Sequence, residues 1–99
     1  MDLHPDHLAV VKDILKKRVS FAEVRAFGSR VTGKAQKHSD FDLVVVAEGP
    51  LASPLLSLLQ GDFEESNLPF RVDVLDWHAI SGRFQNLILK KYEVIQKAG

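Results

Sequence analysis

A glycine-serine turn between two apolar segments, the second of them opened by a pair of aspartates, constrains the fold of this chain more than any other feature. The first part reads Ala26-Phe27-Gly28-Ser29-Arg30-Val31-Thr32-Gly33, and Asp40-Phe41-Asp42-Leu43-Val44-Val45-Val46 begins eleven residues after Ser29. Alternation of polar and apolar residues over 23–27 predicts a half-covered strand that stops at the glycine. The valine-rich run over 41–47 predicts a strand covered on both faces, ended by Glu48-Gly49-Pro50. Residues 28–40 are then a turn with room for a short helical turn.

Helical patterns flank this segment. A stripe of Leu8, Val11, Ile14 and Leu15 predicts a helix over about residues 5–18 that starts at Pro5. Ser53-Pro54 and the following leucines predict a second helix over about 53–65. A third strand is expected over 70–77, with two faces: Phe70, Val72, Val74 and Asp76 on one, and Arg71, Asp73, Leu75 and Trp77 on the other.

The end of the chain leaves one choice open. Ser81 is a cap for a third helix that carries Phe84, Leu87 and Ile88. Residues 92–95 fit either an extension of that helix or a short final strand. No repeat, linker or low-complexity segment interrupts residues 1–99. We therefore expect a single α/β (α+β) domain with a small mixed β-sheet and helices packed against it.

Composition excludes several function classes. The 99 residues hold 13 Lys+Arg and 13 Asp+Glu, so no net charge draws the protein onto nucleic acid or an anionic membrane, and we expect no direct nucleic-acid binding. The chain has no cysteine, which excludes disulfides, thiolate zinc sites and thiol nucleophiles. Its start lacks the pattern of a signal peptide, and no apolar run reaches the roughly 20 residues of a membrane span. A cytoplasmic protein is expected.

Three aspartates are the candidate catalytic and metal-binding residues. Asp40 and Asp42 point to the same side of a strand, about 6.6 to 6.8 Å apart along it. If Asp73 lies on an adjacent strand at the same end of the sheet, the three carboxylates converge. Because like charges repel, such a cluster calls for a cation, and oxygen-only ligands favour Mg²⁺ or Mn²⁺. Paired ions of this kind serve nucleotidyl transfer, with Asp73 positioned to receive the proton of the acceptor hydroxyl.

The turn supplies candidate phosphate ligands. Gly28 permits close approach of the backbone to a phosphate, and the amide and hydroxyl of Ser29 are hydrogen-bond donors. Arg30, Lys34 and Lys37 are candidates for neutralising a triphosphate.

This pattern resembles the minimal nucleotidyltransferases of the DNA polymerase beta superfamily, whose signature is a Gly-Ser turn, then Asp-x-Asp, then a third carboxylate on a later strand. The stretch from Gly28 to Gly33 also matches the Gly-Ser-Arg-x-x-Gly extension, and Ser39 to Leu43 matches Ser-Asp-hydrophobic-Asp-Leu. The resemblance implies a polymerase-beta-like nucleotidyltransferase fold, ATP as substrate and magnesium as cofactor. It also implies catalytic and metal-binding roles for Asp40, Asp42 and Asp73, and adds Ser39 to the nucleotide-binding candidates Gly28, Ser29 and Arg30.

Relatives of this length resemble the antitoxins of prokaryotic modules whose other half is an all-helical HEPN-domain protein. That resemblance implies transfer of AMP from ATP to a tyrosine hydroxyl of the partner. Few residues follow Asp73, so we expect the partner to present the acceptor. Two alternatives stay open: a non-catalytic subunit that masks its partner, and transfer to a small molecule or RNA with the help of another chain. Homo- and hetero-oligomers are both compatible.

Other polar and aromatic residues receive structural interpretations. We expect His4 and His7 to be solvated, and Asp76 to face away from Asp73 and to serve solvent or a helix cap. Trp77, Phe70 and Phe41 are assigned to the core or an interface. The pattern does not decide whether Arg71 is a solvated strand residue or a triphosphate contact.

Overall fold

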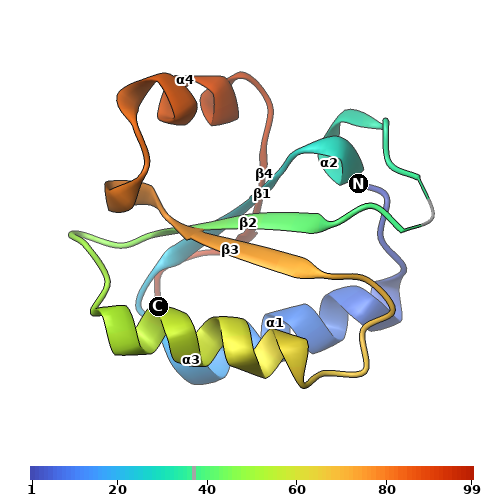
Figure 1. Ribbon diagram of the computed structural model, residues 1–99, viewed down its shortest axis with the longest axis horizontal. Helices are drawn as coiled ribbons and strands as arrows, with labels where there is room; N and C mark the ends of the chain where they lie inside the picture. The colour runs from blue at the N-terminus through green and yellow to red at the C-terminus, as the bar shows by residue number, and fades with distance from the viewer. Residues whose placement is uncertain (37) are drawn as a thin grey trace.

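The computed structural model describes residues 1–36 and 38–99 and arranges them around a four-stranded mixed sheet (Figure 1). Its elements are α1 (Pro5–Val19), β1 (Glu23–Phe27), α2 (Ser29–Thr32), β2 (Phe41–Val46), α3 (Ser53–Glu64), β3 (Val72–Asp76), the 3₁₀ helix η1 (Trp77–Ala79), α4 (Gly82–Lys90) and β4 (Glu93–Gln96). The strands lie in the order β3-β2-β1-β4. Only β2 and β3 are parallel, because β1 runs antiparallel to both of its neighbours. The expected small mixed sheet with packed helices is confirmed.

Most predicted elements form with small shifts at their ends. The first helix extends to Val19, the second strand ends at Val46 and the second long helix ends at Glu64. The third strand is shorter than the predicted 70–77. It ends because the Asp76 carboxylate accepts a hydrogen bond from the amide of His78 (3.0 Å) and so caps η1. Within the described ranges, no helix has both the length and the apolar character needed to cross a membrane.

The end of the chain is a strand. Helix α4 stops at Lys90, the backbone is extended at Lys91, and residues Glu93–Gln96 pair with β1 as β4. Of the two possibilities that the sequence left open for 92–95, the short final strand is therefore the one that forms. Its pairing partner lies in the first third of the chain, so a local pattern has no information about it.

Side-chain alternation gives the sheet one thoroughly buried face. Every second residue of β1 and of β3 is buried, and α1 and α3 lie along that face (Figure 1). Burial of one aliphatic side chain contributes roughly 1.5–3 kcal/mol, so this layer is the main source of stability. Its core comprises Val11, Leu15, Val19, Ala22, Val24, Ala26, Val31, Phe41, Leu43, Val45, Leu59, Phe63, Val72, Val74 and Ile95. Helix α4 lies on the other side of the sheet (Figure 1).

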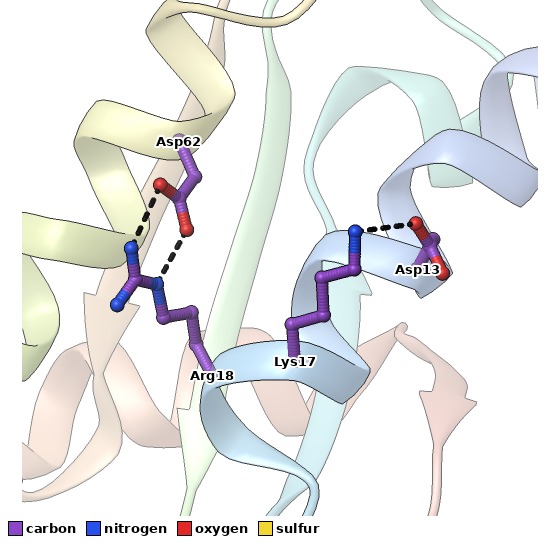
Figure 2. A network of polar contacts seen from close by, with 4 residues as sticks. All are labelled: Asp13, Lys17, Arg18 and Asp62. Carbon is purple, nitrogen blue, oxygen red and sulfur yellow. Dashed lines mark hydrogen bonds and ion pairs between the residues drawn. The ribbon is translucent and has the colours of Figure 1, made fainter.

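One ion pair joins α1 to α3, and a second lies within α1 (Figure 2). Arg18 of α1 donates to both carboxylate oxygens of Asp62 of α3, from Nε at 2.6 Å and from Nη2 at 3.1 Å. This hydrogen bond is the main reason that the pKa of Asp62 is lowered. Lys17 pairs with Asp13 one turn earlier on α1 (3.3 Å). All four side chains are accessible to solvent, so each pair contributes little to stability.

Gln60 of α3 binds the outer edge of β3, which is an edge strand of the sheet. Its Nε2 donates to the carbonyl of Val72 (2.6 Å), and its Oε1 accepts from the amide of Val74 (3.1 Å). An edge strand otherwise presents unpaired backbone groups to other chains. One side-chain amide thus takes the place of a further strand.

We predict that Gln60→Leu lowers the free energy of unfolding by about 1–3 kcal/mol, because the carbonyl of Val72 and the amide of Val74 lose their partner in a partly buried place. Urea denaturation measures the change. The exposed Ser57→Ala variant on the same helix is the control and should stay within about 0.5 kcal/mol of the unaltered chain. Equal stability of the two variants would contradict the edge-binding role.

Candidate active site

The catalytic candidates gather at one end of the strands, where β1 ends and both β2 and β3 begin. The register places Phe27 opposite Asp42, and Asp42 beside Asp73 on the parallel neighbour. Adjacent strands are about 4.8 Å apart, and paired residues project to the same face. Their sequence neighbours Phe41 and Val72 point into the α1/α3 core, so Asp42 and Asp73 face the opposite side of the sheet. The expected juxtaposition of the third acid on an adjacent strand is therefore present.

Asp40 completes the acidic group from the segment just before β2. It is exposed, whereas Asp42 and Asp73 are partly buried. Burial, followed by the charges of Asp73 and Asp40, raises the pKa of Asp42 from its ordinary value of 3.8 to about 6. Both neighbouring carboxylates therefore disfavour the ionised form of Asp42. A cluster of oxygen donors that repel one another is chemically suited to a hard divalent cation.

Arg71 neutralises one member of this group. Its Nε donates to Oδ1 of Asp73 at 2.8 Å, from a position just before β3 and two residues before Asp73. The hydrogen bond and charge of Asp73 raise the pKa of Arg71, with a smaller contribution from Asp40. In the described ranges 1–36 and 38–99, no three acidic or imidazole side chains lie close enough together to hold an ion. Sequence reasoning left the role of Arg71 open, and its position two residues before Asp73 was the available signal.

Gly28 lies directly against the carboxylate of Asp42. Its backbone has φ 84° and ψ −161°, a region almost restricted to glycine. A Cβ atom at this position would lie 2.3 Å from Oδ2 of Asp42. The turn closes tightly, since the carbonyl of Gly28 accepts hydrogen bonds from the amides of Val31 (3.0 Å) and Thr32 (3.1 Å). Absence of a side chain is what lets the end of β1 and the start of β2 meet here.

Arg30 holds the loop that leads to the aspartates. Its side chain is buried, and it donates to the carbonyl of Ser39 from Nε (2.9 Å) and Nη2 (2.7 Å) and to the carbonyl of Asp2 from Nη1 (2.8 Å). The guanidinium also lies over the ring of Phe70, with Cζ 4.4 Å from the ring centroid. These contacts fix Ser39, and with it the entry of Asp40 into β2. Sequence reasoning missed this structural role, and nucleotide binding by Arg30 stays a prediction.

The remaining predicted phosphate ligands lie around the same turn. Ser29 begins α2 and is partly buried, and Lys34 is exposed just after it. The hydroxyl of Ser39 accepts from the amide of Gln36 at 2.8 Å, which shapes the loop. Lys37, also predicted to neutralise a triphosphate, lies outside the described residues.

Residues set aside at the sequence level have structural contacts. His4 caps α1 by accepting from the amide of Asp6 (3.1 Å). Asp76 is buried on the core side of β3, away from Asp73, where its Oδ2 accepts from the amide of Leu51 (2.9 Å). Of the two predicted roles of Asp76, solvent contact or a helix cap, the cap is the one that forms.

Three comparisons with known proteins identify the family and the fold. The sequence profile of the family described as "Polymerase beta, Nucleotidyltransferase" matches residues 10–98. The chain is 47% identical over 97 residues to a "Probable protein adenylyltransferase MntA" of Haemophilus influenzae, an alignment that covers 98% of this chain and 85% of the relative.

Solved structures share the fold. A crystal structure of a toxin-antitoxin with AMP-PNP superimposes with a TM-score of 0.77 at 20% identity, over 91% of this chain and 73% of the other. A structure of a tri-AMPylated Shewanella oneidensis HEPN toxin in complex with its MNT antitoxin matches with a TM-score of 0.68 at 17% identity, over 92% of this chain and 70% of the other.

Replacing the glycine of the turn should disturb Asp42 specifically. We expect Gly28→Ala to lower the free energy of unfolding by about 2–3 kcal/mol, because it combines a strained backbone with displacement of the Asp42 carboxylate. The matched control is Gly33→Ala, which has a similar φ of 79° but no atom within 4 Å of the added Cβ. It should lower stability by only about 1 kcal/mol. Thermal denaturation of both variants measures the difference, and equal losses would exclude a role for the Asp42 contact.

Removing the charge of Asp42 should stabilise the fold when no divalent cation is bound. A folded-state pKa of about 6 against 3.8 means that ionisation of Asp42 destabilises the folded protein increasingly as the pH rises from about 4 to 6. Since the carboxylate is only partly buried, we expect Asp42→Asn to gain about 1 kcal/mol at pH 8 and nothing near pH 4. Urea denaturation in chelator at the two pH values measures this gain.

The control for this experiment is Asp13→Asn on the exposed side of α1, which should change stability by less than about 0.5 kcal/mol at either pH. A loss of stability in Asp42→Asn at pH 8 would show that the carboxylate makes a favourable contact and is not under repulsion.

Proposed function

The chain belongs to the polymerase beta nucleotidyltransferase family, and from that membership and the site geometry we propose that it transfers AMP from ATP to a hydroxyl group of a partner protein. The observation that supports this most directly is the pairing of Asp42 with Asp73 on parallel strands. The charge of Asp40 also acts on Asp42, whose carboxylate lies against Gly28. Acids alone are common on sheet edges. Acids in contact with a glycine turn that leaves room for phosphate are typical of nucleotide chemistry.

Asp40, Asp42 and Asp73 would hold magnesium. Their oxygen-only donors and the raised pKa of Asp42 fit a hard divalent cation. When bound, the ion supplies charge neutralisation for the triphosphate and stabilises the entering and leaving oxygens. Arg71 pairs with Asp73 in the cation-free protein and would have to yield this carboxylate when the ion binds.

The chain's own residues would arrange the in-line transfer. Gly28 and Ser29 lie where the triphosphate approaches the backbone, and Ser39, Arg30 and Lys34 are further proposed contacts or supports. The acceptor hydroxyl oxygen attacks the α-phosphorus, and the bond from this phosphorus to the leaving pyrophosphate breaks. Asp73 receives the hydroxyl proton, directly or through water. Positioning and electrostatics account for the rate enhancement in such a site.

We propose that residues 1–99 act as a single minimal domain and that a HEPN-type protein presents the acceptor. The fold neighbours named for a tri-AMPylated HEPN toxin with its MNT antitoxin, and for a toxin-antitoxin with AMP-PNP, support this choice. The three acids lie at the accessible edge of the sheet, which suits an acceptor carried by another chain. Masking of a partner without chemistry, and transfer to a small molecule or RNA, are the alternatives that the experiment has to separate.

The direct test is incubation with ATP, magnesium and the protein encoded beside this one, followed by mass spectrometry. We expect the partner to gain one or more AMP units, each adding the mass of a nucleotide monophosphate at a hydroxyl side chain. A partner that is inhibited but unmodified would instead support masking.

Asp42→Asn tests the assignment of the acid. The substitution keeps the shape of the side chain but removes a ligand charge, so transfer should fall by a factor on the order of 10² or more while the fold survives. Asp13→Asn is the control and should transfer AMP at the unaltered rate. Undiminished transfer by Asp42→Asn would contradict the site.

A further inference from the structure

The outer edge of β4 is open, in contrast to the opposite edge of the sheet. Both β3 and β4 are edge strands, but the side chain of Gln60 binds the free side of β3. Strand β4 pairs with β1 alone, and in the described ranges 1–36 and 38–99 no further hydrogen bond reaches the backbone of 93–96. Backbone N–H and C=O groups on the outer side of such a strand can therefore pair with another extended chain.

A hollow lies beside this edge, between the second half of α1 and the end of β4. It has a volume of about 300 Å³, and its lining includes Lys12 and Lys16 of α1 together with Ile95, Gln96 and Lys97. The nearly buried side chain of Ile95 contributes apolar surface, and the three lysines are exposed around it. Backbone groups that can pair and side chains that can contact an added segment thus occur at one place.

The three lysines have no acidic partner in the part of the chain that the structure describes. The lining of the hollow includes no acidic side chain, and no ion pair involves Lys12, Lys16 or Lys97. By contrast, the two residues that follow Lys16 on α1 both pair with aspartates. Since Lys12 and Lys16 lie one turn apart, their charges repel each other. An anionic ligand would relieve this repulsion.

We propose that the outer edge of β4 binds an extended acidic segment of a partner protein by strand addition. The segment would continue the sheet beyond β4, and its acidic side chains on the α1 side would lie among the three lysines. The described lining has no aromatic side chain on which the bases of RNA could stack, so the chemistry favours a peptide. A second copy fits less well, because twofold pairing of β4 with itself would bring the same lysines of two α1 helices together.

The proposed segment would bind away from the candidate acids. Helix α1 covers the core face of the sheet, whereas Asp42 and Asp73 face the opposite side. Binding at β4 therefore leaves the acids accessible, and it does not depend on the proposed AMP transfer. A partner held at this second place would have a raised effective concentration at the acids.

A synthetic peptide tests the proposal without ATP or magnesium. The probe is a fluorescently labelled octapeptide of alternating glutamate and valine, and its binding to the full chain is measured by fluorescence anisotropy. We expect the triple variant Lys12→Gln/Lys16→Gln/Lys97→Gln to bind the peptide about fivefold or more weakly, because each lost charge pair contributes a factor of roughly 1.5 to 5.

The matched control removes the same number of positive charges from exposed positions elsewhere, as Lys17→Gln/Arg83→Gln/Lys90→Gln. At about 0.15 M salt, charges more than roughly 8 Å away are largely screened, so this variant should bind the peptide within about twofold of the unaltered protein. Equal weakening in the two triple variants would overturn the proposal, because the attraction would then come from overall charge.

Hydrogen exchange measures the backbone part of the proposal. Saturating peptide should slow the exchange of outward-facing amides within 93–96 in the unaltered protein. Unchanged exchange there would exclude strand addition even if the peptide binds.

The remaining outcomes also overturn the proposal, and each identifies a different use of the edge. Absence of peptide binding, together with lysine-dependent binding of an octauridine RNA, would assign the lysines to nucleic acid. Sedimentation of the protein as a dimer that the peptide does not dissociate would assign the edge to a second copy. Binding of neither probe by a monomer would leave the lysines as a solvated surface. None of these results bears on AMP transfer, which is tested separately.

Discussion

The contact between the backbone of Gly28 and the carboxylate of Asp42 is the constraint on which the site depends. It joins the end of β1 to the start of β2 with no side chain between them. The backbone of Gly28 lies in a region that other residues avoid, and a side chain there would collide with Asp42. Both the conformation of the turn and the position of the carboxylate therefore require glycine. Arg30 extends the same constraint by binding the carbonyl of Ser39 and so fixing the loop before Asp40.

Electrostatics gives the acidic edge its second property. Burial and two neighbouring acids raise the pKa of Asp42. Arg71 donates a hydrogen bond to the carboxylate of Asp73. The carboxylates of such a site repel one another when no divalent ion is bound. The same repulsion that would favour binding of a cation therefore lowers the stability of the cation-free fold. The α1/α3 core supplies the stability that makes such an arrangement tolerable.

The two faces of the sheet differ in what they carry: one holds the core, and the other holds the candidate acids. One face is packed by α1 and α3, with nearly all of its apolar side chains buried. The other carries Asp42 and Asp73 and is met by α4, whose exposed Phe84 and Leu87 line a cavity next to Gly28. An element that contributes little to the core is free to contribute to binding.

Periodicity predicted the elements well, because helices and strands bury one stripe or one face and so leave a local record in the sequence. The Gly-Ser turn and the Asp-x-Asp pair were likewise readable, since both act through residues close together in the chain. The length of β3 was overestimated, as the capping bond of Asp76 to His78 competes with strand geometry in a way that alternation does not reveal. A final strand over 93–96 was one of two readings until its pairing was known.

By itself, the sequence determined the mixed α/β class, the sites of turn and helix initiation, and the identity of the candidate acids. Tertiary structure alone decided that β3 lies parallel to β2 and brings Asp73 beside Asp42, and that Arg71 pairs with Asp73. It also decided that Arg30 binds backbone carbonyls and that α4 borders an open cavity next to Phe27 and Gly28. The physical reason is range. Propensity and periodicity act over a few residues, whereas strand order, ion pairing and cavities arise from segments that meet only when the chain has folded.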